Sequence, residues 1–355
     1  MKQNWYKILA VILMIYIIIA GMLIPIGPGI VGVSHGNSSS IVAGESITLK
    51  VNGYNAHYTS GENKAFLAVK VKDDDSRYTI AANNIQVIDD QQMEVTFTIP
   101  STSPFNETKE AGLFIDNELD GFAILPSAVF INPIGKIQDG AKWQRDQALN
   151  LHARPGLRFP FRNILIETIR NTHYHVSIWM AMFILLTTAA VYSLLAALKE
   201  DPIYDFRASS ITSIAFIFGL MGLATGSLWA KYTWGAFWTN DIKLNMTALS
   251  MMIYAAYFIL RSSIPDEEKR AKVSGIYNVF AFVAMIPLLF VIPRLQDSLH
   301  PGNGGNPAFG GEDLDNTLRM VFYPAIIAWT LLGFWIANLY YRFKKLNYKY
   351  LFESV

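Results

Sequence analysis

The sequence predicts an α-helical polytopic membrane protein with six transmembrane helices and an all-β, sandwich-like domain inserted between the first two. Three observations favour this fold class. Six apolar segments approach or reach the roughly 20 residues needed to cross a bilayer. Residues 36–140 instead hold short runs that alternate apolar and polar residues. The chain is 52% hydrophobic, which suits spans combined with a water-soluble part.

The six predicted spans are nearly free of charge. They are Ile8–Pro25, Val176–Leu198, Ala208–Ala230, Leu244–Leu260, Val273–Pro293 and Met320–Tyr341. Lys2 and Lys7 precede the first, as in a signal peptide, but its apolar run is long and no clear small-residue cleavage site follows. We therefore interpret it as an uncleaved anchor.

Lysine and arginine in the short loops predict the orientation. If the N-terminus is cytoplasmic, the inside set is Lys2, Lys7, Lys199, Arg207, Arg261, Lys269, Arg270, Lys272, Arg342, Lys344, Lys345 and Lys349. The short outside loops then hold only Lys231, Lys243, Arg294 and Arg319. By the positive-inside rule both termini are expected in the cytoplasm, with the β domain outside.

The β-like runs include SITLKVNGY, AFLAVKVK, MEVTFTIP and GFAILPSAVFI, separated by turn-rich pieces such as SGENK. We expect a small antiparallel sandwich without a catalytic constellation, with His57 as a solvated surface residue. The predicted organisation is an anchor at 1–30, a β domain at 31–145, a connector with an amphipathic helix at 146–175, five spans at 176–345 and a cytoplasmic tail at 346–355.

Composition excludes several functions. The chain has no cysteine, which removes disulfides, thiolate metal sites and thiol redox chemistry. Its net charge of +1 gives no basic footprint for nucleic acid.

Five aromatic residues fall within ten positions in the break between the third and fourth spans. They are Trp229, Tyr232, Trp234, Phe237 and Trp238, and Asp241 follows them. We predict an outside loop at 229–243 whose flat apolar surface suits a tetrapyrrole. The alternative is that these rings only anchor helices at the headgroup level.

None of the six histidines lies deep in a span. His175 is expected at the outer mouth of the second span, and His300 in the outside loop before the sixth. Two such imidazoles can ligate a haem iron from opposite faces. His173 and His175 point to nearly opposite sides of a helix, so only one can face a shared pocket. The glycine-rich run after His300 lacks the pattern of a phosphate loop and reads as a flexible loop.

The run ATGSLWAKYTWGAFWTNDIKLN, with RNTHYHVSIW before it and SLHPG after it, resembles the tryptophan-rich motif of the haem-handling CcmC/CcsA family of cytochrome c assembly proteins. The resemblance covers about residues 165–345. It implies that His175 and His300 are axial ligands of haem b held non-covalently in transit. It implies that Trp229, Trp234, Trp238 and Asp241 hold the macrocycle.

The resemblance also places Arg170 near the haem, where a guanidinium can pair with a propionate. Lys243 stands where the family usually has arginine, and keeps the charge without the bidentate fork. Asn240 replaces a usual tryptophan and Ser177 a usual proline. The large outside insertion is foreign to the family pattern.

The family implies haem delivery rather than classical enzyme catalysis. Haem would pass to a membrane-tethered chaperone like CcmE, with release driven by an ABC-type partner like CcmA with CcmB. Three alternatives remain from the sequence: a cytochrome c synthetase core of the CcsA type, a membrane b-type oxidoreductase, and a non-enzymatic scaffold. The synthetase ranks second because no histidine lies on the cytoplasmic side, and the oxidoreductase lacks histidines within the spans.

Overall fold

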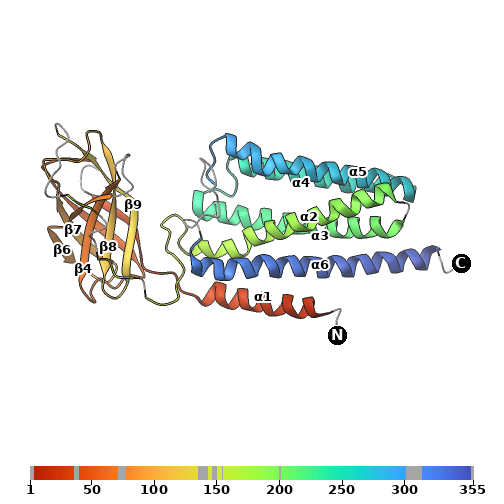
Figure 1. Cartoon of the computed structure of the whole chain (residues 1–355), viewed down its shortest axis with the longest axis horizontal. Coiled ribbons are helices and arrows are strands. Elements are labelled where there is room, and N and C mark those ends of the chain that lie inside the picture. Colours follow the sequence, from red (N-terminus) through yellow and green to blue (C-terminus); the bar gives the residue numbers. More distant parts are fainter. Residues whose placement is uncertain are drawn as a thin grey trace. The chain divides into compact units, whose positions relative to one another are not determined.

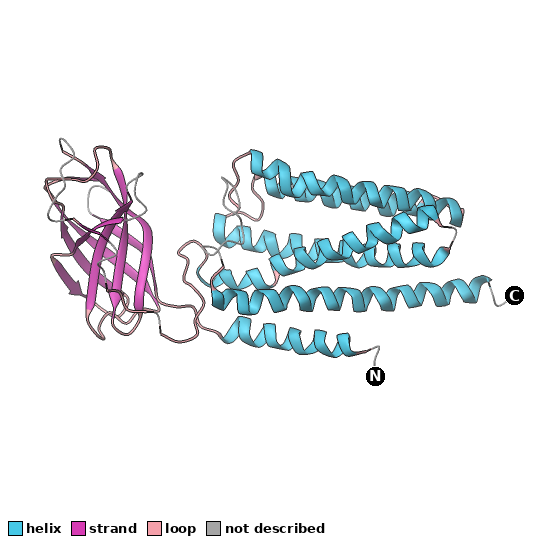
Figure 2. Ribbon diagram, in the orientation of Figure 1, coloured by secondary structure: helices cyan, strands magenta, loops and turns pink. Residues whose placement is uncertain are grey.

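The computed structural model describes residues 4–35, 40–70, 77–134, 143–145, 150–153, 155–199, 201–300 and 314–352. The chain forms two compact units, one of Met1–Leu23 with Glu167–Val355 and one of Ile24–Ile166. Figure 2 shows that the first is helical and the second is built of strands. We describe each unit by itself.

Six helices of the helical unit are long and apolar enough to cross a membrane, which confirms the predicted class. They are α1 (Trp5–Leu23), α2 (His175–Leu198), α3 (Pro202–Trp234), α4 (Ile242–Ser262), α5 (Glu267–Ile286) and α6 (Asn316–Phe352). Helix α5 is prolonged by a π-helical turn, Pro287–Val291, and a 3₁₀ turn, Ile292–Leu295. Each turn has a proline in its first residues, where the missing N–H breaks the regular α-helical ladder.

Local capping residues set several helix ends. Asp201 begins α3 by accepting the N–H of Ile203 at 2.9 Å, with Pro202 as the first helical residue. Asp266 begins α5 in the same way, accepting from Lys269. Gly235 ends α3 in a left-handed conformation, φ 83°, that disfavours other residues.

Helix α2 lies at the centre of the bundle and packs on α3, α5 and α6, while α1 packs on α6 and α4 on α5 (Figure 1). The short connections between α2, α3, α4 and α5 make these helices alternate in direction. Figure 1 shows α1 beginning and α6 finishing at the same end of the bundle. The starts of α2 and α4 and the end of α3 therefore meet at the opposite end.

A buried ion pair ties α3 to α4 far from that end. Arg261 donates to both carboxylate oxygens of Asp205, at 2.6 and 2.5 Å. Nearby, Asn278 of α5 donates to Ser193 and Thr212, each at 2.8 Å. Polar groups inside an apolar bundle must bond to one another, so this network specifies how these helices pack.

The β unit is a two-sheet sandwich. One sheet has the order β1-β3-β7-β6 and the other β10-β5-β4-β8-β9-β2; among the described strands, β2 and β9 pair in parallel and the other pairs are antiparallel. The strands are β1 (Gly29–His35), β2 (Ser40–Val42), β3 (Ser46–Tyr54), β4 (Asn63–Lys70), β5 (Arg77–Ala81), β6 (Asn84–Val87), β7 (Gln92–Thr98), β8 (Lys109–Asn117), β9 (Gly121–Asn132) and β10 (Gln144–Arg145). One apolar core, with Val51 and Phe97 from the first sheet and Leu67 and Leu113 from the second, fills the space between them.

The two ends of the β unit lie side by side. Phe159 donates its N–H to Pro25 and accepts the N–H of Gly27, both at 2.8 Å. The unit thus begins before the predicted residue 31 and extends beyond residue 145.

The connector differs from the expected amphipathic helix. Among the described residues of the connector, helical structure begins with a 3₁₀ segment, Ile166–His173, that runs directly into α2. Ile166 has a positive φ of 45° and closes a turn on the carbonyl of Arg162. This backbone reversal prevents a helix from starting earlier.

Candidate functional site

His175 is the first residue of α2, and its imidazole lies against the last turns of α3. Its Nδ1 is 3.1 Å from the hydroxyl oxygen of Thr225. The same hydroxyl lies within hydrogen-bond distance of the carbonyls of Met221 and Gly222. In the tautomer with its hydrogen on Nδ1, His175 donates to Thr225 and keeps on Nε2 the lone pair with which an imidazole binds a metal.

A glycine makes room for this imidazole. A Cβ added at Gly226 would come within 2.5 Å of His175 Cε1. The indoles of Trp179 and Trp229 meet the imidazole edge-on, at centroid distances of 6.3 and 5.6 Å. The ring is therefore held by close packing as well as by its hydrogen bond.

His300 lies beyond the 3₁₀ turn that follows α5, and Asp241 holds it. The imidazole Nδ1 is 3.1 Å from Asp241 Oδ1, and Asp241 Oδ2 accepts the N–H of Leu299 at 2.8 Å. Asp241 also starts α4 by accepting the N–H groups of Lys243 and Leu244. One buried carboxylate thus caps a helix and fixes a distant histidine.

Burial by itself raises the pKa of Asp241. Hydrogen bonds from the Ser298 side chain and the Leu299 N–H, with the charge of His300, outweigh it, so the pKa of this carboxyl lies below its usual value. Burial lowers the pKa of His300, the Lys243 ammonium lowers it further, and Asp241 restores it only in part. At neutral pH His300 is therefore neutral, with its Nδ1–H donated to Asp241 and its Nε2 lone pair available.

The two imidazoles belong to one electrostatic neighbourhood at this end of the bundle. A charge on His300 interacts electrostatically with His175, and the charge of Lys243 interacts with both histidines. His173, in contrast, is fully buried, and a Cβ at Gly21 of α1 would meet its ring at 3.5 Å. The structure thus directs His173 toward α1 and His175 toward the aromatic cluster.

The tryptophans occupy different positions around these imidazoles. Trp234 packs edge-on against His300, with centroids 4.8 Å apart. Trp229 packs on His175 and donates its indole N–H to Thr168. Trp238 is exposed, and its indole N–H lies 3.4 Å from the side-chain oxygen of Asn245.

The predicted outside loop at 229–243 is wrong in its extent. Helix α3 continues to Trp234 and α4 begins at Ile242, so the loop is only the segment from Gly235 to Asp241. The hydropathy pattern ended the third span at Ala230, but helical hydrogen bonding persists until Gly235 allows the chain to reverse. Trp229 and Trp234 consequently stand on a rigid helix.

Arg170 and Lys243 differ in their relation to the site. Arg170 donates to Glu167 at 2.6 Å and to the carbonyl of Gly21 at 2.8 Å, which ties the 3₁₀ segment to the end of α1. Lys243 is half-buried; the charge of Asp241 acts on it, and its own charge acts on His175 and His300. Of the two cations, Lys243 is the one that shares the neighbourhood of both imidazoles.

Thr225 and Gly226 were not predicted to belong to the site, although both lie in the tryptophan-rich run that begins at Ala224. The signal that could have found them is position, since they lie one helical turn before Trp229. The glycine-rich run expected to form a flexible loop falls at 301–311, outside the described residues.

The imidazoles of His175 and His300 suit a metal ion whose remaining ligands come from a macrocycle. No group of three or more His, Cys, Asp or Glu side chains that could hold a bare metal ion occurs within the described ranges. Instead, each of two imidazoles has its Nδ1 beside an oxygen, of Thr225 for His175 and of Asp241 for His300, and an indole packs edge-on against each. This arrangement fits an iron porphyrin.

Comparison with known proteins agrees with this chemistry. Residues 167–300 match the model of the family described as "Cytochrome C assembly protein", and the match ends at His300. A protein named "Heme exporter protein C" from Bradyrhizobium diazoefficiens is 25% identical over 170 residues, covering 46% of this chain and 62% of that protein. One of the same name from Haemophilus influenzae is 26% identical over 135 residues, covering 38% and 53%.

A "Cytochrome c biogenesis protein CcsA" from Arabidopsis thaliana is 29% identical over 96 residues, which cover 27% of this chain and 28% of that protein. The chain thus spans about half to three fifths of the heme exporter proteins it matches. Across residues 167–300, this chain is therefore similar to the cytochrome c assembly protein family, and strands β1 to β10 lie between its first two predicted spans.

Proposed function

We propose that this multi-pass membrane protein binds haem at the outer end of its helical bundle and delivers it for the assembly of c-type cytochromes. The family similarity supports the cargo, because several relatives are named heme exporters. The observation that carries the proposal is the pair His175 and His300, each with its Nδ1 beside an oxygen at one end of the bundle. The protein acts as a carrier rather than as a classical enzyme.

In this proposal His175 and His300 supply the two axial ligands of haem b. Trp229 and Trp234 limit the positions of the two imidazoles, and Lys243 provides the charge that attracts a propionate. Arg170 acts indirectly, by fixing the segment that leads into His175. Trp238, which is exposed, offers a face to the macrocycle or to the lipid headgroups.

A delivery site must hold its cargo and also release it. His175 is fixed on a helix, whereas His300 is held in a non-helical segment by one carboxylate, Asp241. Breaking the hydrogen bonds of Asp241 to Leu299 and His300 frees one ligand without unfolding a span. We infer that release proceeds on the His300 side.

The remaining assignments follow the family. The site faces the periplasmic side of the bacterial inner membrane, both termini are cytoplasmic, and a chaperone like CcmE takes the haem, with CcmA and CcmB as partners. The distribution of lysine and arginine supports this orientation.

The test is the haem content of purified protein. We expect His175→Ala and His300→Ala to lose most bound haem and the low-spin bis-histidine bands in oxidised and reduced spectra. His152→Ala, in the β unit, is the matched control and keeps both. If both site variants purify with wild-type haem and unchanged Soret bands, the ligand assignment is wrong. A wild-type chain that carries no haem under ample haem supply favours the scaffold alternative.

A further inference from the structure

Two cations and three tyrosine rings gather at the end of the helical bundle opposite the histidine pair. Cζ of Arg207, in the second turn of α3, lies 5.5 Å from the ring centroids of both Tyr192 in α2 and Tyr341 in α6. Nζ of Lys199, directly after α2, lies 5.2 Å from the ring centroid of Tyr204, whose ring lies 6.4 Å from that of Tyr192. Figure 1 shows the end of α2, the start of α3 and the last turns of α6 at this end. We call these five residues the cation–tyrosine cluster.

The guanidinium of Arg207 is held in a defined orientation. It donates an N–H to the hydroxyl of Tyr192 at 3.1 Å and lies over two rings from two different helices. A guanidinium has five N–H donors, so those that do not bond to Tyr192 remain available to a ligand. Arg207 and Lys199 are both exposed, whereas the three tyrosines are half-buried. The rings therefore support the cations, which face outward.

The charges of the cluster are not balanced by nearby carboxylates. Asp201 accepts a backbone N–H in the first turn of α3, and both carboxylate oxygens of Asp205 accept from Arg261. Among the residues that the structure describes, neither Arg207 nor Lys199 forms an ion pair. The cluster thus presents two positive charges without a counterion from the described part of the chain.

The surroundings of the cluster are those of a span that meets lipid headgroups. Tyrosine is enriched at this level of a membrane helix, with its ring in the apolar region and its hydroxyl in the polar one. Leu194 and Leu198 in the last turns of α2 are exposed, as is Leu339 just before Tyr341 in α6. Acyl chains can pack on these side chains. The distribution of lysine and arginine predicts that this end faces the cytoplasm.

A phosphate group of a lipid satisfies these groups together. The guanidinium fork matches the oxygens of a phosphate, and an ammonium attracts the same group as a point charge. Basic pockets between membrane helices on the cytoplasmic side bind anionic headgroups in this way. Because the cluster carries two cations, a headgroup with a net negative charge suits it better than a zwitterionic one.

We propose that the cation–tyrosine cluster binds the phosphate of an anionic phospholipid from the cytoplasmic leaflet. Arg207 donates N–H groups to the phosphate, and Lys199 adds attraction. Tyr192 and Tyr341 position the guanidinium. Because the cluster is built from α2, α3 and α6, a lipid bound there stabilises the packing of these helix ends. Tyr341 lies beyond the family match, which ends at residue 300, and the site does not depend on haem.

The experiment measures lipid binding through stability. Full-length protein in a neutral detergent is titrated with phosphatidylglycerol, with phosphatidylcholine of the same acyl chains, and with inorganic phosphate. We expect phosphatidylglycerol to raise the thermal unfolding temperature with saturation, since a ligand that binds only the folded state stabilises it. Phosphatidylcholine and inorganic phosphate at equal concentrations should change it little.

Two variants test the assigned contacts. Arg207→Gln should weaken the binding of phosphatidylglycerol about tenfold, which corresponds to one charged hydrogen bond. Tyr192→Phe keeps the ring but removes the bond that orients the guanidinium, so it should weaken binding about two- to fivefold. If Arg207→Gln does not fold, Tyr192→Phe and Lys199→Gln carry the test, and unchanged affinity in both overturns the proposal.

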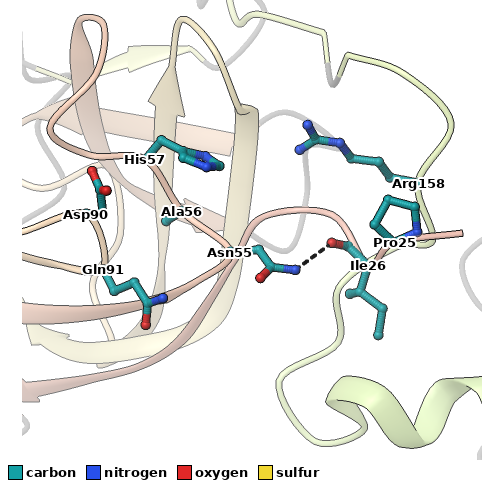
Figure 3. A pocket seen from close by; sticks show the side chains of 8 residues that line it. All are labelled: Pro25, Ile26, Asn55, Ala56, His57, Asp90, Gln91 and Arg158. Atoms are coloured by element: carbon teal, nitrogen blue, oxygen red, sulfur yellow. Dashed lines mark hydrogen bonds between the residues drawn. The ribbon is translucent and has the colours of Figure 1, made fainter. Parts of the chain in front are cut away.

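The controls remove an arginine outside the cluster. Arg342→Gln removes an exposed cation directly after Tyr341, and it should leave the affinity almost unchanged. Arg158→Gln does so in the β unit, where Figure 3 shows the guanidinium in a pocket whose lining includes no tyrosine.

Three outcomes contradict the proposal. One is a failure of phosphatidylglycerol to stabilise the wild-type protein. Another is equal stabilisation by inorganic phosphate, which would identify a free anion as the ligand. The third is an equal loss of affinity in Arg207→Gln and Arg342→Gln, which would mean that diffuse charge attracts the lipid. None of these measurements uses haem, so their failure leaves the proposed function unaffected.

Discussion

Asp241 Oδ1 lies 3.1 Å from the Nδ1 of His300, across 59 residues of sequence. The same carboxylate accepts the N–H of Leu299 and starts α4. A single side chain therefore joins the loop after α3 to the segment after α5, and it orients the one predicted ligand that no helix holds.

We expect Asp241→Asn to lower haem affinity roughly 10- to 100-fold, the usual cost of losing the carboxylate behind a ligating histidine. Asparagine caps a helix about as well as aspartate, so the thermal unfolding temperature should change little. Hemin titration and thermal unfolding in detergent measure the two effects. Asp201→Asn is the control, because Asp201 only caps α3. Equal losses of affinity in both variants would contradict an orienting role for Asp241.

The protonation of His300 gives a prediction with a definite sign. Because its pKa lies below the ordinary value of 6.5, the unfolded chain binds this proton more readily than the folded protein. The stability that the folded protein gains from a neutral His300 is fully present above pH 6.5. It is lost as the pH falls from 6.5 through the lowered pKa. Histidine-selective NMR of haem-free protein should place the midpoint below 6.5, with His300→Ala assigning the signal.

Two variants test the causes of this shift. Lys243→Gln removes a cation and should raise the midpoint of His300, whereas Asp241→Asn removes an anion and should lower it. An unchanged midpoint in both variants would show that burial alone sets the protonation of His300.

Gly226→Ala should disturb the His175 ligand. The new Cβ would stand 2.5 Å from His175 Cε1, so either the imidazole or α3 must move. We expect loss of low-spin haem bands and destabilisation of about 1–3 kcal/mol, which is typical of overpacking. Gly21→Ala in α1 is the matched control, since its Cβ would make ordinary contacts at 3.5 Å or more. A normal spectrum in Gly226→Ala would mean that the imidazole position is not set by α3.

Asp205→Ala should be among the more damaging substitutions away from the site. It leaves the buried Arg261 guanidinium without its carboxylate, and breaking such a pair costs about 3–5 kcal/mol. Glu267→Ala removes the partner of Arg270 in an exposed pair and should cost less than about 1 kcal/mol. Thermal unfolding of both variants in the same detergent measures the difference. Similar losses in the two would indicate that water reaches Asp205.

The spans could be predicted from the sequence because membrane length and apolar composition leave little choice. The sandwich could be predicted because strands such as Gln92–Thr98 alternate strictly between buried and partly exposed residues. The ends of the helices were harder to predict. Gly235 and Asp241 are capping residues that the sequence displays, but hydropathy alone placed the end of α3 at Ala230.

The candidate site was predictable in its residue types and not in its contacts. We predicted His175, His300 and the tryptophans as site residues from the family resemblance and from the side of the membrane on which the charge pattern places them. The bond between Asp241 and Leu299 joins residues 58 apart, and no local pattern encodes it. Thr225 and Gly226 gain their roles only when α3 lies against α2.

The backbone bonds of Phe159 with Pro25 and Gly27 hold the first residues of the β unit beside a segment close to its end. A module that leaves the chain where it entered imposes no separation on the flanking sequence. It behaves as a cassette, which insertion can add and excision can remove while the neighbouring helices keep their spacing.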